Sequence, residues 1–596
     1  MTNPASLNLK ALRAQMRKAG IDAYIIPSSD PHQSEYTPAY WKCRAWLTGF
    51  LGSAGTAVVT QKEAGIWTDF RYFIQAAAEL KGSGFTLFKM GEKDVPTWQD
   101  WIAKTLPEKA TVGCFGQLLS MQTVRDLEKK LAPKQQKLNG ANDLIAPIWT
   151  KGRPALPTDI IALHDLKYAG KSRKEKLATV REKMKAKGAD WYLISSLDDV
   201  AWLYNIRGND IPYCPFVLSY ALIGMKTATL FVDPAKVPAG VAKALKKDGI
   251  GISDYDEVAG TLKRLPKTAA VYLAPLRISQ ALNAAIPAKA KRIEGRDITT
   301  ELKTVKNPTE IENFRRHMVQ DGVAMVKFLY WLEQEMKANR KVSEISAEVK
   351  LSALRAVRPE SCGDSFATIA GYADHAAMCH YKAAPESQYT LKKRGLFLVD
   401  SGGQYGGATT DITRTMAVGP LTVEEKTDYT LVLKGNINIT MTRFLKGCTG
   451  TNLDILARIA MWQQRIDFKH GTGHGIGNFL SVHEGPQNLS QAWNDVAFAP
   501  GMLVTVEPGI YREGKHGIRL ENVVLCAEEG ESAFGSFLKF TPLTLCPFDL
   551  TPVIREMLTP AETAWLNEYH ESVRRQITPF LTKVEAAWLR KATRAI

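Results

Sequence analysis

The sequence predicts a mixed protein in which two related α/β domains precede a third, α+β domain. Three observations support this class. A chain of 596 residues is too long for one hydrophobic core. One order of elements occurs twice in the first half, and β-rich runs that end in acidic residues occupy the second half. We place the domains at residues 1–152, 153–304 and 305–596.

A diverged internal duplication predicts the two leading domains. Residues 10–26 have the pattern of a helix that stops at a glycine and is followed by a strand, and residues 181–194 repeat that order. Each copy then reaches the tripeptide Ala-Trp-Leu, at residues 45–47 and 201–203. A repeated order of elements indicates a repeated structural unit, so we expect the same α/β fold twice.

Proline-rich and capping signals indicate the boundaries. The first boundary is expected near the segment Lys-Gly-Arg-Pro-Ala-Leu-Pro at 151–157, and the second near residues 303–310. Within the second segment, Asn307 and a proline are followed by Glu310, which predicts a capped helix start. We then expect helices through residues 310–356, strands from residue 366 onward and a helical C-terminal tail.

Composition is ordinary for a soluble globular protein, with 45% hydrophobic and 23% charged residues. No apolar run is long enough for a membrane span, and the N-terminus has no apolar signal-peptide core. The eight cysteines include no Cys-x-x-Cys pair, which predicts free buried thiols in a reducing compartment. We therefore expect a cytoplasmic protein with no membrane partner.

The net charge of +16 raises nucleic acid as a partner class. The basic residues, however, are spread along helical segments such as 171–176 and 183–187, alternate with Glu and Ala, and have no stacking aromatics among them. That pattern is typical of a solvated helix face. No nucleic-acid partner is expected.

Five potential metal ligands follow one another in the C-terminal half, each in a short distinctive segment. They are Asp400 in Val-Asp-Ser-Gly-Gly, Asp411 in Thr-Asp-Ile-Thr, His474 in Gly-Thr-Gly-His-Gly-Ile-Gly, Glu507 in Val-Glu-Pro-Gly and Glu521 in Arg-Leu-Glu-Asn. Four carboxylates and one imidazole suit hard or borderline ions such as Mn²⁺, Co²⁺ or Zn²⁺. Their combined charge is sufficient for two such ions, held roughly 3.5–4 Å apart.

Apolar runs lead into three of these acids and read as buried strands. The runs are Gly-Leu-Phe-Leu-Val before Asp400, Gly-Met-Leu-Val-Thr-Val before Glu507 and Gly-Ile-Arg-Leu before Glu521. A carboxylate at the buried end of a strand is costly unless it is paired or metal-bound. Turn-rich residues between Asp400 and Asp411 predict adjacent antiparallel strands that bring these two acids together.

Two nearby residues are expected to support the ligands. Arg519 lies two residues before Glu521, so in an alternating strand the two face one side, where the guanidinium can hold metal carboxylates by bidentate hydrogen bonds. His470 lies four residues before His474 and would share its face in a helix. The intervening Gly-Thr-Gly favours a loop or strand, which puts His470 behind the ligands.

The ordered Asp, Asp, His, Glu, Glu set resembles the pita-bread metallopeptidases: methionine aminopeptidase, prolidase and aminopeptidase P. The surrounding sequence is most similar to the three-domain Xaa-Pro aminopeptidases, and the resemblance covers nearly the whole chain. The segments that carry it begin at Trp46, Trp67, Val200, Lys306, His470, Val482 and Trp565. One stretch departs: Asp-His-Ala-Ala-Met-Cys-His-Tyr, at residues 374–381, replaces a more usual Asn-Gly-Ala-Ile-x-His-Tyr.

The resemblance implies a pita-bread fold for the third domain and release of the first residue from peptides with proline second. Asp400 is expected on one ion, Asp411 and Glu521 on both, and His474 and Glu507 on the other, with a bridging hydroxide as nucleophile. Glu507 is also the expected proton shuttle. His380 and His483 are implied as residues that bind the substrate or the oxyanion, and Arg71 as a substrate-side residue. The resemblance further implies a homodimer and two divalent ions, Mn²⁺ foremost.

Three other functions remain open at the level of the sequence. Prolidase, which cleaves only dipeptides, shares the ligand set. A non-catalytic scaffold of the same fold that binds basic proteins or nucleic acid would be expected to have lost ligands, and this chain keeps all five. A creatinase-like hydrolase has no need of the acidic set.

Overall fold

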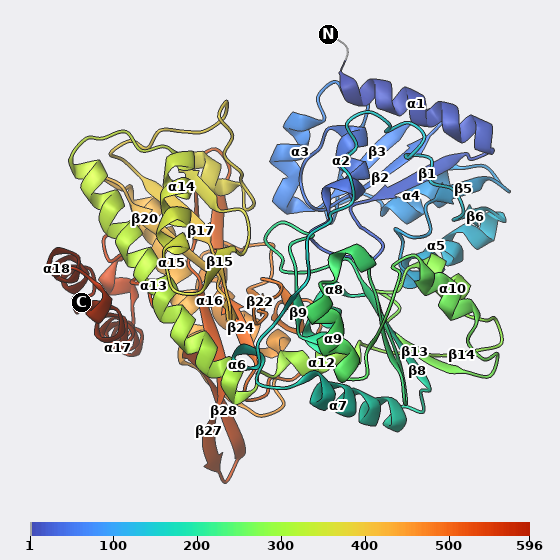
Figure 1. Cartoon of the computed structure of the whole chain (residues 1–596). Coiled ribbons are helices and arrows are strands. Elements are labelled where there is room, and N and C mark those ends of the chain that lie inside the picture. The colour runs from blue at the N-terminus through green and yellow to red at the C-terminus, as the bar shows by residue number, and fades with distance from the viewer. Residues whose placement is uncertain (1–2) are drawn as a thin grey trace. The chain divides into compact units, whose positions relative to one another are not determined.

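The computed structural model describes residues 3–596, which form two compact units. One unit runs to His164 and resumes over Lys171–Thr299, and the other combines Asp165–Gly170 with Thr300–Ile596. Figure 1 colours the first unit blue to green and most of the second yellow to red. Each unit is described by itself.

The first unit contains two six-stranded sheets, and the first sheet has the order β4-β3-β2-β1-β5-β6. Neighbours β1–β2 and β2–β3 are antiparallel, and the remaining pairs are parallel. The strands are β1 (Ala23–Pro27), β2 (Thr56–Thr60), β3 (Ala64–Thr68), β4 (Thr86–Lys89), β5 (Thr111–Cys114) and β6 (Lys137–Asn139); the helices are α1 (Pro4–Ala19), α2 (Cys43–Thr48), α3 (Phe73–Glu79), α4 (Trp98–Thr105) and α5 (Met121–Leu131).

The second sheet has the order β12-β11-β10-β8-β13-β14, with the same sequence of antiparallel and parallel pairs. Its strands are β8 (Trp191–Ile194), β10 (Tyr220–Gly224), β11 (Ala228–Phe231), β12 (Gly251–Ser253), β13 (Ala270–Leu273) and β14 (Lys291–Glu294); the helices are α7 (Arg173–Ala186), α8 (Leu197–Tyr204), α9 (Ala239–Lys247), α10 (Glu257–Lys263) and α11 (Gln280–Ala285), and a short pair joins β7 (Ala162–Leu163) to β9 (Ile206–Arg207). The predicted duplication is confirmed strand by strand.

Equivalent segments of the two copies pair with each other. Ser120 caps α5 and Ser279 caps α11, and these serines form an antiparallel bridge. The Met121 amide donates to the Ile278 carbonyl at 2.9 Å, and an equivalent bond on the other side of the bridge completes the exchange. Because each serine occupies the same place in its copy, this contact relates the duplicated halves by an approximate two-fold.

The second unit begins with the short α6 (Leu166–Ala169) and α12 (Ile298–Thr304), of which the last five residues belong to it, and continues with the long α13. As predicted, α13 starts at Pro308 after a capping box formed by Asn307 and Glu310. The helices that follow are α13 (Pro308–Lys337), α14 (Glu344–Ala356), α15 (Val423–Met441), α16 (Gly450–Trp462), α17 (Pro560–Ile577) and α18 (Lys583–Ala592). The last two confirm the expected helical tail.

Strands of the second unit form several small antiparallel sheets, with orders β16-β17-β20, β21-β28-β27-β24, β15-β18-β19, β22-β23 and β25-β26. Their bounds are β15 (Ser361–Asp364), β16 (Ile369–Tyr372), β17 (Leu396–Ser401), β18 (Gly403–Tyr405), β19 (Ala408–Thr409), β20 (Ile412–Ala417), β21 (Arg443–Leu445), β22 (Gly473–Gly475), β23 (Glu484–Leu489), β24 (Leu503–Val506), β25 (Gly509–Arg512), β26 (His516–Arg519), β27 (Asn522–Ser532) and β28 (Gly535–Pro542). Apolar residues of α15, α16, α17 and the β24–β28 strands share one core.

The expected antiparallel strands around Asp400 and Asp411 are present as β17 and β20. The residues between them do more than turn, because β18 and β19 leave this sheet and pair in a second one with β15. The change of sheet occurs at Gly402, where an added Cβ would lie 1.9 Å from the Thr410 carbonyl oxygen. Only glycine permits this close approach.

Two further expectations concern the thiols and the membrane. All eight cysteines are free, as predicted, but Cys362 is exposed and Cys448 is half-buried, so burial holds only for the others. None of the helices over residues 3–596 is long and apolar enough to cross a membrane. The domain limits at residues 152 and 304 stay a prediction.

Candidate metal centre

Strand register brings the two aspartates together. Asp400 lies near the end of β17, opposite Thr413 of β20, and Asp411 immediately precedes β20. Both are at least nine-tenths buried. One carboxylate oxygen each from Asp400, Asp411 and Glu521 lie within 4.8 Å of one another, which is close enough to share metal ions.

The two glutamates reach the same place from a second strand pair. In the antiparallel pair of β24 and β27, Val506 is opposite Asn522. Glu507 follows β24 and Glu521 precedes β27, so both acids lie at one end of this pair. The Glu521 amide donates to the Thr413 carbonyl at 3.1 Å, which joins this end to β20 and its aspartate.

His474 lies on β22 and completes the set. Its Nδ1 is 2.9 Å from the Gly475 carbonyl oxygen, so we assign the proton to Nδ1 and leave the Nε2 lone pair for a metal. Nε2 lies 3.5 Å from Asp411 Oδ2 and 3.5 Å from Glu507 Oε1. The preceding Gly473 is required here, because an added Cβ would lie 1.8 Å from the Thr505 carbonyl oxygen.

Buried carboxylates crowd this site and perturb one another. Burial is the main cause that raises the pKa values of Asp400, Glu507 and Glu521, that of Glu507 to about 6. Neighbouring carboxylates raise these pKa values further, whereas Arg519 acts in the opposite direction. A single guanidinium does not balance four acids, so the arrangement calls for additional cations.

Two buried oxygens test whether cations fit. Among residues 3–596, Asp400 Oδ1 and Glu521 Oε1 have no hydrogen-bond partner. The second oxygen of each carboxylate accepts a hydrogen bond: Arg519 donates to Asp400 Oδ2, and Thr413 Oγ1 donates to Glu521 Oε2 at 2.9 Å. Each acid is therefore oriented through one oxygen and presents the other to the centre, the arrangement that metal ligation requires.

Arg519 differs from its expected geometry. It donates through a single nitrogen to Asp400, because its Nε bonds Thr413 at 3.2 Å and its Nη1 bonds the Tyr511 hydroxyl at 2.8 Å. Arg519 therefore bonds the metal carboxylates through one nitrogen, to Asp400, instead of through the expected bidentate hydrogen bonds, and its Nε lies 4.0 Å from Glu507 Oε2. The Tyr511 hydroxyl is also 2.9 Å from His470 Nε2, so His470 lies behind Arg519, at the end of a hydrogen-bonded chain.

The two remaining histidines approach the centre from irregular segments. His483 can join Asp411 and His474 in a potential metal group, and its ring lies 4.3 Å from the His474 ring. His380 follows Cys379, whose carbonyl oxygen is 3.5 Å from Arg519 Nη2. Their roles toward a substrate stay a prediction.

Comparisons with known proteins agree along the whole chain. The Creatinase/Prolidase N-terminal domain matches residues 8–148 and 152–310, metallopeptidase family M24 matches residues 312–528, and the C-terminal region of peptidase M24 matches residues 536–596. "Probable Xaa-Pro aminopeptidase P" of Botryotinia fuckeliana is 38% identical over 98% of this chain and 92% of that protein. The same-named protein of Coprinopsis cinerea is 37% identical over 100% of this chain and 99% of its own length.

The chain belongs to the Xaa-Pro aminopeptidase P family. Among solved structures, X-prolyl aminopeptidase from Caenorhabditis elegans matches with a TM-score of 0.96 and 33% identity, covering 99% of this chain and all of that one. That protein is described as a cytosolic enzyme with a di-nuclear active site. Membership of the Xaa-Pro aminopeptidase P family confirms the predicted fold class and makes this chain a metal-dependent aminopeptidase.

Sequence reasoning missed two residues that orient the ligands. Thr413 lies two residues after Asp411, and strand alternation could have placed its hydroxyl on the ligand side. Tyr511 left no comparable signal, because its contact with Arg519 depends on the β25–β26 hairpin, in which Ile510 is opposite Ile518. In this aminopeptidase P family member both hydroxyls hold Arg519.

Arg71 lies in the first unit, in the middle of the short helical turn Phe70–Tyr72. Its guanidinium forms a two-pronged ion pair with Asp69, at 2.7 and 2.8 Å. Asp69 also caps that turn by accepting from the Arg71 amide. These contacts give Arg71 a local structural role, and its substrate-side role stays a prediction.

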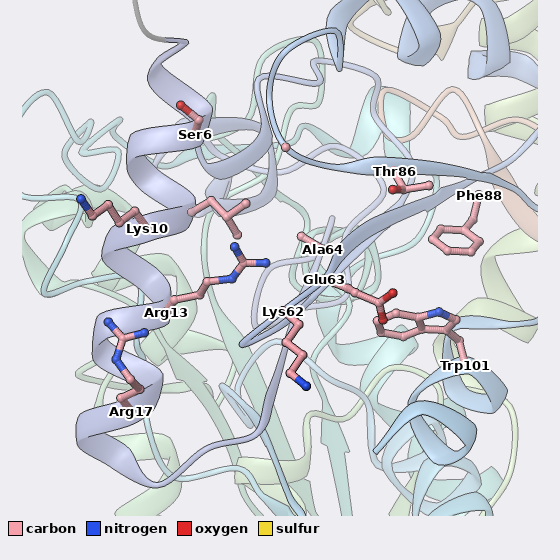
Figure 2. Close-up of a pocket in the computed structure, with 12 residues that line it drawn as sticks. Ser6, Lys10, Arg13, Arg17, Lys62, Glu63, Ala64, Thr86, Phe88 and Trp101 are labelled. Carbon is pink, nitrogen blue, oxygen red and sulfur yellow. The ribbon is translucent and has the colours of Figure 1, made fainter. Parts of the chain in front are cut away.

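A hollow of about 660 Å³ lies in the N-terminal domain between α1, β3, β4 and α4 (Figure 2). It is lined by several cations, among them Lys10, Arg13 and Arg17. In Figure 2, Arg13 points toward Ala64 whereas Lys10 points away from it, so these charges do not converge on one point. The hollow contains none of the predicted site residues of this aminopeptidase P family member.

Proposed function

We propose that this chain removes the N-terminal residue from peptides whose second residue is proline. The observation that carries the proposal is the convergence of four carboxylates and one imidazole, with two buried oxygens directed into the centre. The printed names of the fungal relatives and of the nematode enzyme support the choice of substrate. Two divalent ions are expected, Mn²⁺ foremost, with Co²⁺ and Zn²⁺ also compatible with these ligands.

Each ligand has a place in the proposed site. Asp400 would hold one ion, Asp411 and Glu521 would contact both, and His474 with Glu507 would complete the other. Two bound ions would lower the pKa of a coordinated water and polarise the scissile carbonyl. The ligand residues themselves need only stay in place, and Arg519 with Thr413 keeps two of them oriented.

One of the ligands and two further side chains would handle the substrate. The nitrogen of an Xaa-Pro bond carries no hydrogen, so it must receive a proton before it can leave. Glu507 is the proposed proton carrier, because it lies at the edge of the centre and is less buried than the other acids. His380 and His483 would hydrogen-bond the substrate carbonyl or the charge that develops on it.

A metal and substrate series tests this function. Purified protein should release arginine from Arg-Pro-Pro, lose this activity to a chelator and regain it with Mn²⁺, Co²⁺ or Zn²⁺, as followed by mass spectrometry. Hydrolysis that ignores the chelator would overturn the metal role. Cleavage of Arg-Pro alone would instead indicate a prolidase, and salt-sensitive DNA binding without hydrolysis would indicate a scaffold.

We also propose a cytoplasmic homodimer formed through α16. Three large apolar side chains of this helix are exposed at helical spacing: Ile455, Ile459 and Trp462, the last two at 47% and 44%. Such a stripe is costly in water unless a second surface covers it. Light scattering should give a dimer mass for the natural chain and a monomer mass for Trp462→Glu, and an unchanged dimer would place the interface elsewhere.

A further inference from the structure

Glu344 is a buried carboxylate whose role no motif explains. It occupies the first position of α14, where its side chain is fully buried. It is not one of the potential metal ligands, and its neighbours include no lysine or arginine among residues 3–596 in ion-pair contact. A buried charge of this kind is tolerated only when hydrogen bonds satisfy it, so its partners indicate its function.

The partners of Glu344 all lie in one segment, residues 372–389. Oε1 accepts from the Tyr372 amide at 2.8 Å, and Oε2 accepts from the Tyr389 amide at 2.7 Å and the Tyr381 hydroxyl at 2.9 Å. His375 Nδ1 lies 2.9 Å from Oε1. A single carboxylate thus ties the beginning, the middle and the end of this segment.

His380 lies inside that segment, directly before Tyr381. Its other neighbour, Cys379, is the residue whose carbonyl oxygen approaches Arg519. Tyr372 ends β16, and from there to Tyr389 the segment contains a short helical turn, Ala373–Ala377, and no other helix or strand. The Tyr381 amide donates to the Met378 carbonyl at 2.9 Å and shapes the turn at residue 380, but no strand fixes where this turn lies, so its place depends also on side-chain contacts at both flanks.

His375 explains how the unusual sequence of this stretch is accommodated. Its ring stacks on Tyr389 with centroids 3.6 Å apart and an interplanar angle of 12°. The same ring packs at 4.4 Å from Tyr381. Since Glu344 fixes Nδ1 of this ring, His375 acts as a spacer that holds Tyr381, and hence His380, at a set distance from α14.

We propose that Glu344, acting through His375 and Tyr381, is a positioning residue for His380. This inference rests on the proposed function, in which His380 contacts the substrate. An error of about 1 Å in a reacting group can lower a rate by about 100-fold, so a change at Glu344 should reach the chemistry without touching it. The ligand set belongs to other strands and should keep its metals.

The first test replaces the carboxylate by an amide. In Glu344→Gln, an NH2 group faces donors that previously pointed at an oxygen, and the segment must shift. We expect kcat for Arg-Pro-Pro to fall by about 100-fold, with KM changed much less and with natural metal content. Glu348→Gln is the control on the same helix: it is one turn further along α14, has none of these bonds and is only half-buried, so the loss of its charge, which Lys382 faces, should lower kcat far less than Glu344→Gln.

A double-substitution cycle separates positioning from general damage. If Glu344 acts through His380, then Glu344→Gln added to His380→Ala should lower kcat little beyond His380→Ala alone. The proposal would be overturned if the double variant lost kcat by the product of the two separate factors. It would also be overturned if Glu344→Gln alone kept the kcat of the natural chain. Failure of the proposed function is a different result, because the natural chain itself would then leave Arg-Pro-Pro intact.

A milder variant keeps the test informative if Glu344→Gln does not fold. Tyr381→Phe removes one hydroxyl that donates to Glu344 and leaves the carboxylate with its amide partners. We expect a several-fold loss of kcat that also disappears in the His380→Ala background. A thermal unfolding temperature equal to that of the natural chain would show that the loss is not a loss of folded protein.

Discussion

The metal ligands and His380 are positioned by different means. Asp400, Asp411, Glu507 and Glu521 lie at or beside the ends of strands whose antiparallel register sets their separation. His380 lies between β16 and β17 in a stretch with no strand of its own, and Glu344 holds that stretch from one side. Ligand placement is therefore a property of backbone pairing, whereas His380 placement is a property of side-chain anchoring.

His483 also has a buried glutamate beside it. Glu484 is its direct neighbour, and its side chain is fully buried against two lysines. Lys306 forms a close ion pair with one oxygen, and Lys303 Nζ lies 3.7 Å from the other. Lys306 directly precedes the capped helix start at Asn307, so the entry to α13 is tied to the residue next to His483. His483 differs from His380, however, because it directly precedes β23, in which Glu484 is opposite Gly475 of β22, so strand pairing helps to place it as well.

The largest effect is expected at the metal ligands. Asp411→Ala or Glu521→Ala removes an oxygen that both ions would share, and strand pairing leaves the fold intact. We expect release of arginine from Arg-Pro-Pro to be abolished, with reduced metal content by mass spectrometry and an unchanged circular dichroism spectrum. Glu424→Ala, an exposed acid on α15, is the control. Full activity in either ligand variant would refute the shared role.

Much of this contrast follows from how sequence encodes the two kinds of position. An apolar run that ends in an acid can be recognised in the sequence itself, so β17, β24 and their ligands were predictable. Strand alternation could have added Thr413. Glu344 was not predictable, because its partners lie in a different segment and its own position, the first turn of a helix, is common for acids on solvent-exposed helices.

The same reasoning explains the wrong details. Arg519 was correctly placed beside the carboxylates, but its guanidinium uses different nitrogens to bond Asp400, Thr413 and Tyr511. All three partners come from other strands, and no local pattern indicates how the nitrogens are shared among them. Likewise, the sequence around Gly402 predicted a simple turn, but in the structure this glycine allows the chain to pass from one sheet to another. Local chemistry was predictable, and contacts between distant segments were not.

An intermediate effect on stability and kcat is expected when Glu484, the buried acid next to His483, loses its charge. Glu484→Gln would leave Lys303 and Lys306 buried without their shared carboxylate, which typically costs about 3–5 kcal/mol. Lys306→Met leaves one lysine for the glutamate and should cost less. Urea unfolding measures both, and kcat should follow the same order. Equal stability of the two variants would contradict a charge-balance role for Glu484.

The smallest effect is expected on the strand side, at Tyr511. Tyr511→Phe removes a hydroxyl that bonds both Arg519 and His470, yet Arg519 keeps its contacts with Asp400 and Thr413, and the β17–β20 register still holds the acids. One hydrogen bond to a charged group contributes about 1.5–3 kcal/mol when isolated, but partial solvent access should reduce this. We expect a loss of kcat clearly smaller than that of Glu344→Gln, measured on Arg-Pro-Pro in parallel. If Tyr511→Phe were instead the more damaging change, ligand placement would depend on side-chain anchoring as much as His380 does, because backbone register alone would then be insufficient.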